Sequence, residues 1–149
     1  MHIQTKYLGE IEIEEEKVIH FPAGLPGFIN ETEFIVLDLS GNPIFQILQS
    51  IKSVNTAFIV TNPYHVYQDY SVNLDDQILE FLQINNDKEV VVLTIVTLKK
   101  PFDRSTINLK APIIINAASK RGKQYILNSN NYSTKASIAP VNASIVKGE

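Results

Sequence analysis

The residue types that could carry out chemistry are scattered along this chain and match no known catalytic pattern. The three histidines, His2, His20 and His65, lie far apart and lack the His-x-x-x-His or cysteine spacing of a zinc site. Ser50, His65 and Asp69 could supply the groups of a hydrolase triad, but no Gly-x-Ser-x-Gly motif surrounds the serine. The glycine motifs that bind nucleotides are absent as well. The sequence therefore predicts a protein that is not an enzyme and needs no metal or cofactor.

Side-chain amides are the next candidates, because several stand where strands are expected to end. They are Gln49, Asn62, Asn108 and Asn116. Amides at such positions either tie down the backbone of their own loop or present hydrogen bonds to a partner. Both interpretations remain open from the sequence.

The most informative segment is a loop rich in proline and glycine at residues 21–28, which we call the Pro/Gly loop. Phe21-Pro22-Ala23-Gly24 has the pattern of a type I turn. Leu25-Pro26-Gly27-Phe28 has the pattern of a type II turn, whose third residue needs a positive φ. Loops between strands are usually polar, so a stiff apolar loop indicates a docking surface for another protein. The alternative is that Phe21, Leu25 and Phe28 plug the core, and the two roles can coexist.

Charge is distributed unevenly along the chain. Residues 1–75 carry a net charge of -7, and residues 76–149 carry +4. The acidic residues of the first half include Glu10, Glu12, Glu14, Glu15, Glu16, Glu31, Glu33 and Asp69. Such a surface would steer a basic protein toward it. Solvated strand faces that are kept charged against aggregation are the other interpretation.

A second class of function is binding of RNA by a small β-barrel. A basic patch interleaved with aromatic residues occurs in the C-terminal half, at Lys120, Arg121, Lys123, Tyr125 and Tyr132. Patches of this kind bind single strands by stacking and phosphate contacts. The chain as a whole is acidic, with a pI of about 5.6, which weakens this alternative.

These features must be positioned by many short strands and one helix. The pattern predicts a mainly β, compact, antiparallel β-barrel-like or strongly bent sheet in a single domain spanning residues 1–149. Strands are expected at 10–14, 18–21, 33–39, 44–49, 57–61, 89–98, 113–115, 124–127 and 137–139, with a turn at 40–43 and a frayed end at 146–149. A helix is expected over 74–82 with Asn73 as its N-cap, its apolar stripe closing an edge or end of the sheet.

The chain resembles the FliW family of flagellar assembly factors. The resemblance rests on the Pro/Gly loop together with Leu48-Gln49-Ser50, Ala57 to Pro63, Asn108 to Ile113, Asn116 and Gln124, which follow in family order. One departure is Ile29, which stands where the family often has an acidic residue.

The resemblance implies a cytoplasmic protein that binds flagellin and, once released from it, binds and antagonises the RNA-binding translational regulator CsrA. The absence of a leader segment and of an apolar run of ~20 residues agrees with a cytoplasmic location. The predicted partner-binding residues are Phe21, Pro22, Gly24, Leu25, Pro26, Gly27, Phe28, Glu31, Glu33, Gln49, Asn62, Pro63, Asp69, Asn108, Lys110 and Pro112.

Overall fold

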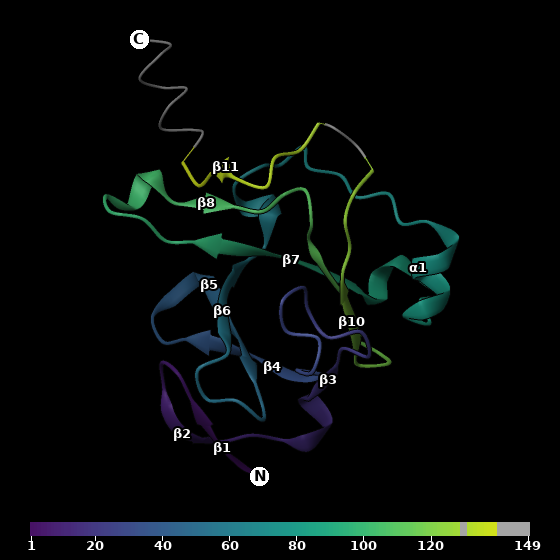
Figure 1. Cartoon of the computed structure of the whole chain (residues 1–149). Coiled ribbons are helices and arrows are strands. Elements are labelled where there is room, and N and C mark those ends of the chain that lie inside the picture. Colours follow the sequence, from purple (N-terminus) through teal and green to yellow (C-terminus); the bar gives the residue numbers. More distant parts are fainter. Residues whose placement is uncertain (129–130, 140–149) are drawn as a thin grey trace.

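The computed structural model describes residues 1–128 and 131–139 and is mainly β (Figure 1). The strands are β1 His2–Thr5, β2 Gly9–Glu12, β3 Ile19–His20, β4 Glu33–Leu39, β5 Asn42–Ser50, β6 Ala57–Thr61, β7 Val90–Thr97, β8 Thr106–Ile107, β9 Ile113–Asn116, β10 Arg121–Gln124 and β11 Ala136–Ser137. The helices are η1 Glu15–Lys17, η2 Pro63–His65, α1 Asp76–Phe81, η3 Asp87–Glu89 and η4 Phe102–Arg104. Among the described residues, no helix has the length and apolar character needed to cross a membrane.

The sheet curls into a closed ring of strands, as the barrel-like prediction expected. Neighbouring strands pair in the order β7, β6, β5, β4, β3, β10 and β9, and β9 pairs again with β7. All these pairings are antiparallel except β3 with β10. Figure 1 shows the ring with the chain between β3 and β4, which contains the Pro/Gly loop, lying across its opening. The hairpin of β1 and β2 packs outside the ring, where Ile3 of β1 and Ile13, which follows β2, contact Ile35 of β4.

The core of the ring follows from the alternation of side chains along its strands. Ile113 and Ile115 of β9 join the inner cluster, whereas Ile114 joins a second cluster with Ile78 of α1 and its C-cap Leu82. The helix therefore covers the outer face of the sheet, and the expectation that it closes an edge or end was wrong. Because both faces are covered, three successive isoleucines can all be buried.

Most strand predictions were confirmed. The errors lie at strand ends and in the two short strands β1 and β8, which were not predicted. Strands 33–39 and 57–61 agree with β4 and β6 to the residue. The predicted turn at 40–43 consists only of Ser40 and Gly41, because Asn42 already pairs with Leu39. The strand predicted at 124–127 begins at Arg121 instead. A left-handed Lys120, with φ of 58°, ends the preceding turn and brings Arg121 opposite Asn116.

Two further boundaries need correction. The N-cap of α1 is Asp75, whose carboxylate accepts a hydrogen bond from the Ile78 N–H at 2.9 Å, and not Asn73. An Asp at this position accepts a hydrogen bond from a free helix N–H group, and its negative charge interacts favourably with the positive end of the helix dipole. The last strand is β11 at Ala136–Ser137, one residue earlier than expected. The predicted frayed end at 146–149 lies outside the described residues.

Candidate protein-binding surface

The Pro/Gly loop forms the two successive turns that its sequence predicts. The Gly24 N–H donates to the Phe21 carbonyl at 2.8 Å, and the Phe28 N–H donates to the Leu25 carbonyl at 2.7 Å. Gly27 has a φ of +81°, as a type II turn requires at its third position. Gly24 also has a positive φ, and a Cβ there would lie 2.6 Å from the backbone of Ile29. The loop therefore has a fixed shape that depends on both glycines.

Burial divides the hydrophobic residues of this loop between two roles. Phe21 and Leu25 are 0% and 2% exposed and belong to the inner cluster of the ring, so they plug the core. Phe28 and Ile29 are 40% and 71% exposed, and the Phe28 ring packs edge-on against Phe58 at 5.4 Å. The exposed tip of the loop, which we define as Pro26, Gly27, Phe28 and Ile29, is available to a partner in this conformation, as are Pro22 and Ala23. Phe21 and Leu25, which were predicted as partner-binding residues, are therefore buried and support the tip.

Glu31 anchors the chain that leaves the tip. Its carboxylate accepts hydrogen bonds from the hydroxyls of Ser50 and Ser53, the second at 2.6 Å. The hydroxyls of Ser50 and Ser53 lower the pKa of Glu31, against the opposing effect of burial. The Ser50 oxygen also accepts the N–H groups of Lys52 and Ser53, so the Glu31 carboxylate and Ser50 together hold the start of the loop between β5 and β6. We infer that Glu31 is a structural anchor with a retained negative charge.

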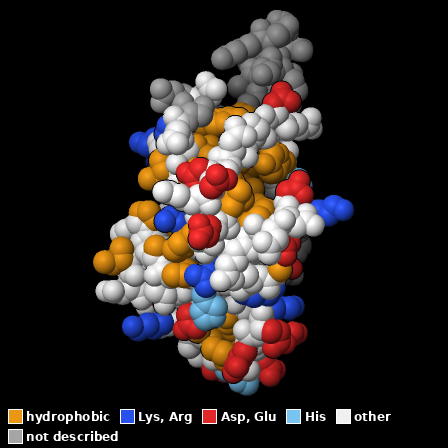
Figure 2. Space-filling view, turned by 90° about the vertical axis from the view of Figure 1, so that its right-hand side faces the viewer, with side chains coloured by type: hydrophobic (Ala, Val, Ile, Leu, Met, Phe, Trp, Pro, Cys, Tyr) orange, Lys and Arg blue, Asp and Glu red, His pale blue; other side chains and the backbone are white. Residues whose placement is uncertain are grey.

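The predicted acidic residues do not all lie together. Glu33 is exposed at the base of the Pro/Gly loop, 3.9 Å from the His20 ring nitrogen. The glutamates of the β1–β2 hairpin and η1 are exposed at the end of the molecule that is lowest in Figure 2, where red side chains gather. Asp69 lies beyond the Thr61 end of β6, whereas Glu31 lies near the Ala57 end. Asp69 precedes Tyr70, which belongs to a separate hydrophobic cluster. The structure therefore separates Asp69 from Glu31 and Glu33.

The four amides form hydrogen bonds with the protein's own backbone. This is the first of the two interpretations that the sequence left open. Buried Gln49 accepts from the Lys6 N–H at 3.0 Å and donates to carbonyls of the β5–β6 loop, including Val54 at 3.1 Å. Asn62 caps η2 by accepting from the Tyr64 N–H. The remaining two act likewise: Asn108 accepts from the Ala111 N–H, and Asn116 donates to the Leu82 and Gln83 carbonyls.

The other predicted binding residues have mixed positions. Pro22 and Pro26 are exposed in the Pro/Gly loop, whereas Pro63 and Pro112 are buried. Lys110 is half-buried, and its backbone bonds to Ser133 and Leu127. These three positions, Pro63, Lys110 and Pro112, lie away from the exposed tip in sequence and position other loops.

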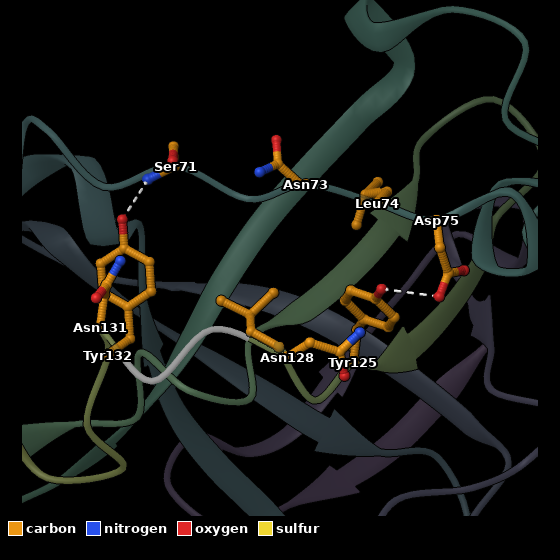
Figure 3. A pocket seen from close by; sticks show the side chains of 9 residues that line it. Ser71, Asn73, Leu74, Asp75, Tyr125, Asn128, Asn131 and Tyr132 are labelled. Carbon is orange, nitrogen blue, oxygen red and sulfur yellow. Dashed lines mark hydrogen bonds between the residues drawn. The ribbon is translucent and has the colours of Figure 1, made fainter.

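Most of the basic and aromatic residues proposed for RNA binding already contact other parts of this protein. The Lys123 ammonium lies 4.7 Å from the centre of the Phe81 ring, and the Lys120 ammonium donates to the Ala117 carbonyl. Figure 3 shows the two tyrosines at opposite ends of one pocket. The Tyr132 hydroxyl accepts from the Ser71 N–H, and the Tyr125 hydroxyl donates to Asp75. Stacking of single-stranded RNA bases on this patch is therefore not favoured.

The described residues also show no assembled catalytic group. Ser50 ends β5 and bonds to Glu31, whereas His65 lies beyond the opposite end of β6, so Ser50 and His65 do not meet. No group of three or more histidine, cysteine or carboxylate residues within 1–128 and 131–139 could hold a metal ion.

Sequence reasoning missed one residue that supports the tip, namely Gly122 on β10. An ideal Cβ at Gly122 would lie 2.6 Å from the Phe21 ring, so only glycine leaves room for that ring. An isolated glycine in a strand is a signal of close approach by another group and could have indicated this contact.

Comparison with known proteins agrees with this geometry. The family model for FliW protein matches residues 2–138. A flagellar assembly factor FliW from Oceanobacillus iheyensis is 51% identical over 138 residues, covering 93% of this chain and 94% of the relative. The Bacillus subtilis protein of the same name is 44% identical, covering 91% and 94%. A crystal structure of the flagellar assembly factor FliW superposes with a TM-score of 0.88 at 41% identity, covering 93% of this chain and 96% of that chain. The chain is a member of the FliW family of flagellar assembly factors.

Proposed function

We propose that this protein works by binding other proteins in the cytoplasm, taking flagellin and CsrA as alternating partners. While flagellin is abundant it occupies the protein; after flagellin export, the free protein captures CsrA and relieves its block on flagellin synthesis. Membership of the FliW family supports a role in flagellar assembly. The single observation that carries the proposal is the exposed apolar tip at Phe28 and Ile29, fixed beside the negative charges of Glu31 and Glu33.

The exposed tip suits the amphipathic helices of flagellin termini. Phe28 and Ile29 project from a loop whose shape is set by two turns and by the anchored Glu31. A rigid apolar projection loses little conformational entropy on binding, so more of its burial energy appears as affinity. An amphipathic helix presents the apolar face that such a projection needs.

The acidic end suits a basic RNA-binding protein such as CsrA. Glu33 and the glutamates of the β1–β2 hairpin are exposed, and residues 1–75 carry a net charge of -7. Charges of this kind act chiefly by accelerating association, and their effect falls as salt screens them.

A competition experiment tests this proposal. Purified full-length protein is immobilised, saturated with flagellin, and then exposed to increasing CsrA, with both bound partners quantified. Partner switching predicts that the immobilised protein retains CsrA only when flagellin is absent or has been displaced. Failure to bind either purified partner would refute the proposal, and retention of labelled RNA by the isolated chain would favour the alternative function.

A further inference from the structure

Strand β7 has an unpaired edge over the first half of its length. Val90 to Leu93 pair with β9 on one side. On the other side, pairing with β6 is confined to Thr94 and Ile95, because β6 ends at Thr61 and the chain turns into η2 at Pro63. Within the part of the chain that the structure describes, no strand pairs with Val90 to Leu93 on that side.

The hydrogen-bonding pattern shows which backbone groups face this open edge. The Glu89 carbonyl accepts from the Ala117 N–H on the β9 side. Since groups alternate along an antiparallel ladder, the N–H and C=O of Val92 and the C=O of Val90 point the other way. The Val90 N–H is already used, because it donates to the Asp87 carbonyl at the end of η3. One donor and two acceptors are therefore directed away from β9.

A groove lies along this edge. It encloses about 390 Å³ and is lined by Asn62, Tyr64, Val72, Leu74, Asp87 and Val90 to Val92. A neighbouring cavity of about 400 Å³ shares Val72, Leu74, Asp87 and Val90 with it. Tyr64 and Val91 are 39% and 40% exposed. The residues that line the two cavities include one carboxylate, that of Asp87, and no cationic side chain.

We propose that this groove binds an extended segment of a partner protein, which adds to β7 as an edge strand. The unpaired groups of Val90 and Val92 would pair with the backbone of the segment, as in other cases of strand addition. An apolar side chain of the segment fits between Tyr64 and Val91, and a lysine or arginine fits beside Asp87. This inference does not depend on the identity of the partners proposed above.

The character of the edge favours a protein ligand over solvent alone. Proteins usually protect open strand edges with lysine, proline or a bulge, because unpaired edges recruit other strands. This edge carries three successive valines instead. At ~3.3 Å per residue, a segment of three to four residues spans the unpaired stretch of β7.

A synthetic peptide provides the probe. The full-length chain, uniformly labelled with ¹⁵N, is titrated with acetyl-Lys-Thr-Val-Thr-Val-Thr-amide and observed by NMR. The proposal predicts amide shifts confined to Val90–Leu93 and to the groove walls near Tyr64, with slower hydrogen exchange at the Val92 N–H. A peptide of the same sequence that is N-methylated at alternate residues is expected to bind at least about tenfold more weakly, since it cannot complete the backbone ladder.

Matched substitutions separate the groove from a general surface effect. Val91→Lys places a cation against the cationic peptide, whereas Val54→Lys makes the same change at a valine of similar exposure (43%) in another loop. Asp87→Asn removes the carboxylate of the groove, and Asp103→Asn on η4 is its control. The two groove variants are expected to weaken binding about threefold or more, and the two controls to leave it unchanged.

Three results would overturn the proposal. One is an absence of shifts at millimolar peptide. Another is equal binding by the N-methylated peptide, which would show contact through side chains alone. The third is a Val92 N–H that is already protected in the free protein and unaffected by peptide. That result would mean that a second copy or another segment of this chain fills the groove, and concentration-dependent sedimentation would distinguish those two.

Discussion

The ring of Phe21 occupies the space that a side chain at Gly122 would need. Phe21 is fully buried at the start of the Pro/Gly loop, directly after β3, and Gly122 lies on β10, the strand that pairs with β3 through Arg121 and His20. Phe21 also packs edge-on against Phe34 at 5.3 Å. This contact fixes the base of the loop against two strands, and so it holds the exposed tip at Phe28 and Ile29 in place.

Gly122→Ala is expected to destabilise the fold by about 1–3 kcal/mol, because the new methyl group would overlap the Phe21 ring in a packed core. Chemical denaturation measures the free energy of unfolding. Phe21→Leu provides the matched test, since the smaller side chain should relieve part of the Gly122→Ala penalty in the double variant. Strictly additive effects of the two substitutions would contradict the contact.

The two glycines of the loop should differ in their tolerance of alanine. Gly27→Ala meets no atom within 4 Å and suffers only from its positive φ, which costs about 1–2 kcal/mol. Gly24→Ala has the same conformational penalty and in addition a Cβ 2.6 Å from the Ile29 backbone. Thermal and chemical unfolding of both variants should therefore rank Gly24→Ala as the more damaging. Equal losses of unfolding free energy in the two variants would mean that the loop shifts to accommodate the Gly24→Ala methyl group at no energetic cost.

Leu25→Ala and Phe28→Ala should separate stability from binding. Leu25 is 2% exposed, so its truncation leaves a core cavity and is expected to cost about 2–5 kcal/mol of unfolding free energy. Phe28→Ala is expected to change stability much less and to weaken flagellin binding, measured by calorimetry. Leu8→Ala, at a similarly exposed leucine (38%) on the β1–β2 turn, is the control. Normal flagellin binding by Phe28→Ala would exclude the tip as its contact.

Glu31 should make stability depend on pH in the acidic range. Hydrogen bonds from Ser50 and Ser53 lower the pKa of the folded state below the usual value of 4.5. A lowered pKa stabilises the fold above the unfolded-state value, and this contribution is lost as the pH falls through the folded-state value. Unfolding free energies measured from neutral pH downward should therefore decline less steeply for Glu31→Gln than for the natural protein. Glu33→Gln is the control, and an unchanged slope for Glu31→Gln would contradict the anchor.

Charge reversal should distinguish the acidic end from the rest of the surface. Glu12→Lys combined with Glu33→Lys is expected to slow association with CsrA about threefold to tenfold at low salt and to flatten its salt dependence. Asp69→Lys introduces the same kind of charge change at the far end of β6 and should have little effect. Stopped-flow association rates across a salt series provide the measurement. A larger effect from Asp69→Lys would move the CsrA contact to that end.

Local patterns in the sequence predicted a large part of the fold. Runs rich in Ile, Val and Phe located β4 and β6 to the residue, and the Pro and Gly spacing predicted both turns of the loop with the correct sign of φ at Gly27. The predicted ends of helices and strands were wrong where local side-chain hydrogen bonds or backbone conformation set them. The N-cap of α1 moved to Asp75, and β10 began early because Lys120 adopts a left-handed conformation. Such details depend on competing local hydrogen bonds, which residue types alone do not rank.

The amino-acid sequence by itself determined the turn chemistry and the absence of catalytic motifs, because each is carried by residues close together in the chain. It also indicated the family, through short motifs that follow in order along the chain. Only the tertiary structure decided which hydrophobic residues of the Pro/Gly loop are buried and which are exposed. It also decided that Glu31 reaches Ser53 in the β5–β6 loop, that Asp69 lies apart from Glu33, and that one edge of β7 stays unpaired. The physical reason is that burial and pairing depend on contacts between residues distant in sequence, and these are fixed when the sheet closes into a ring.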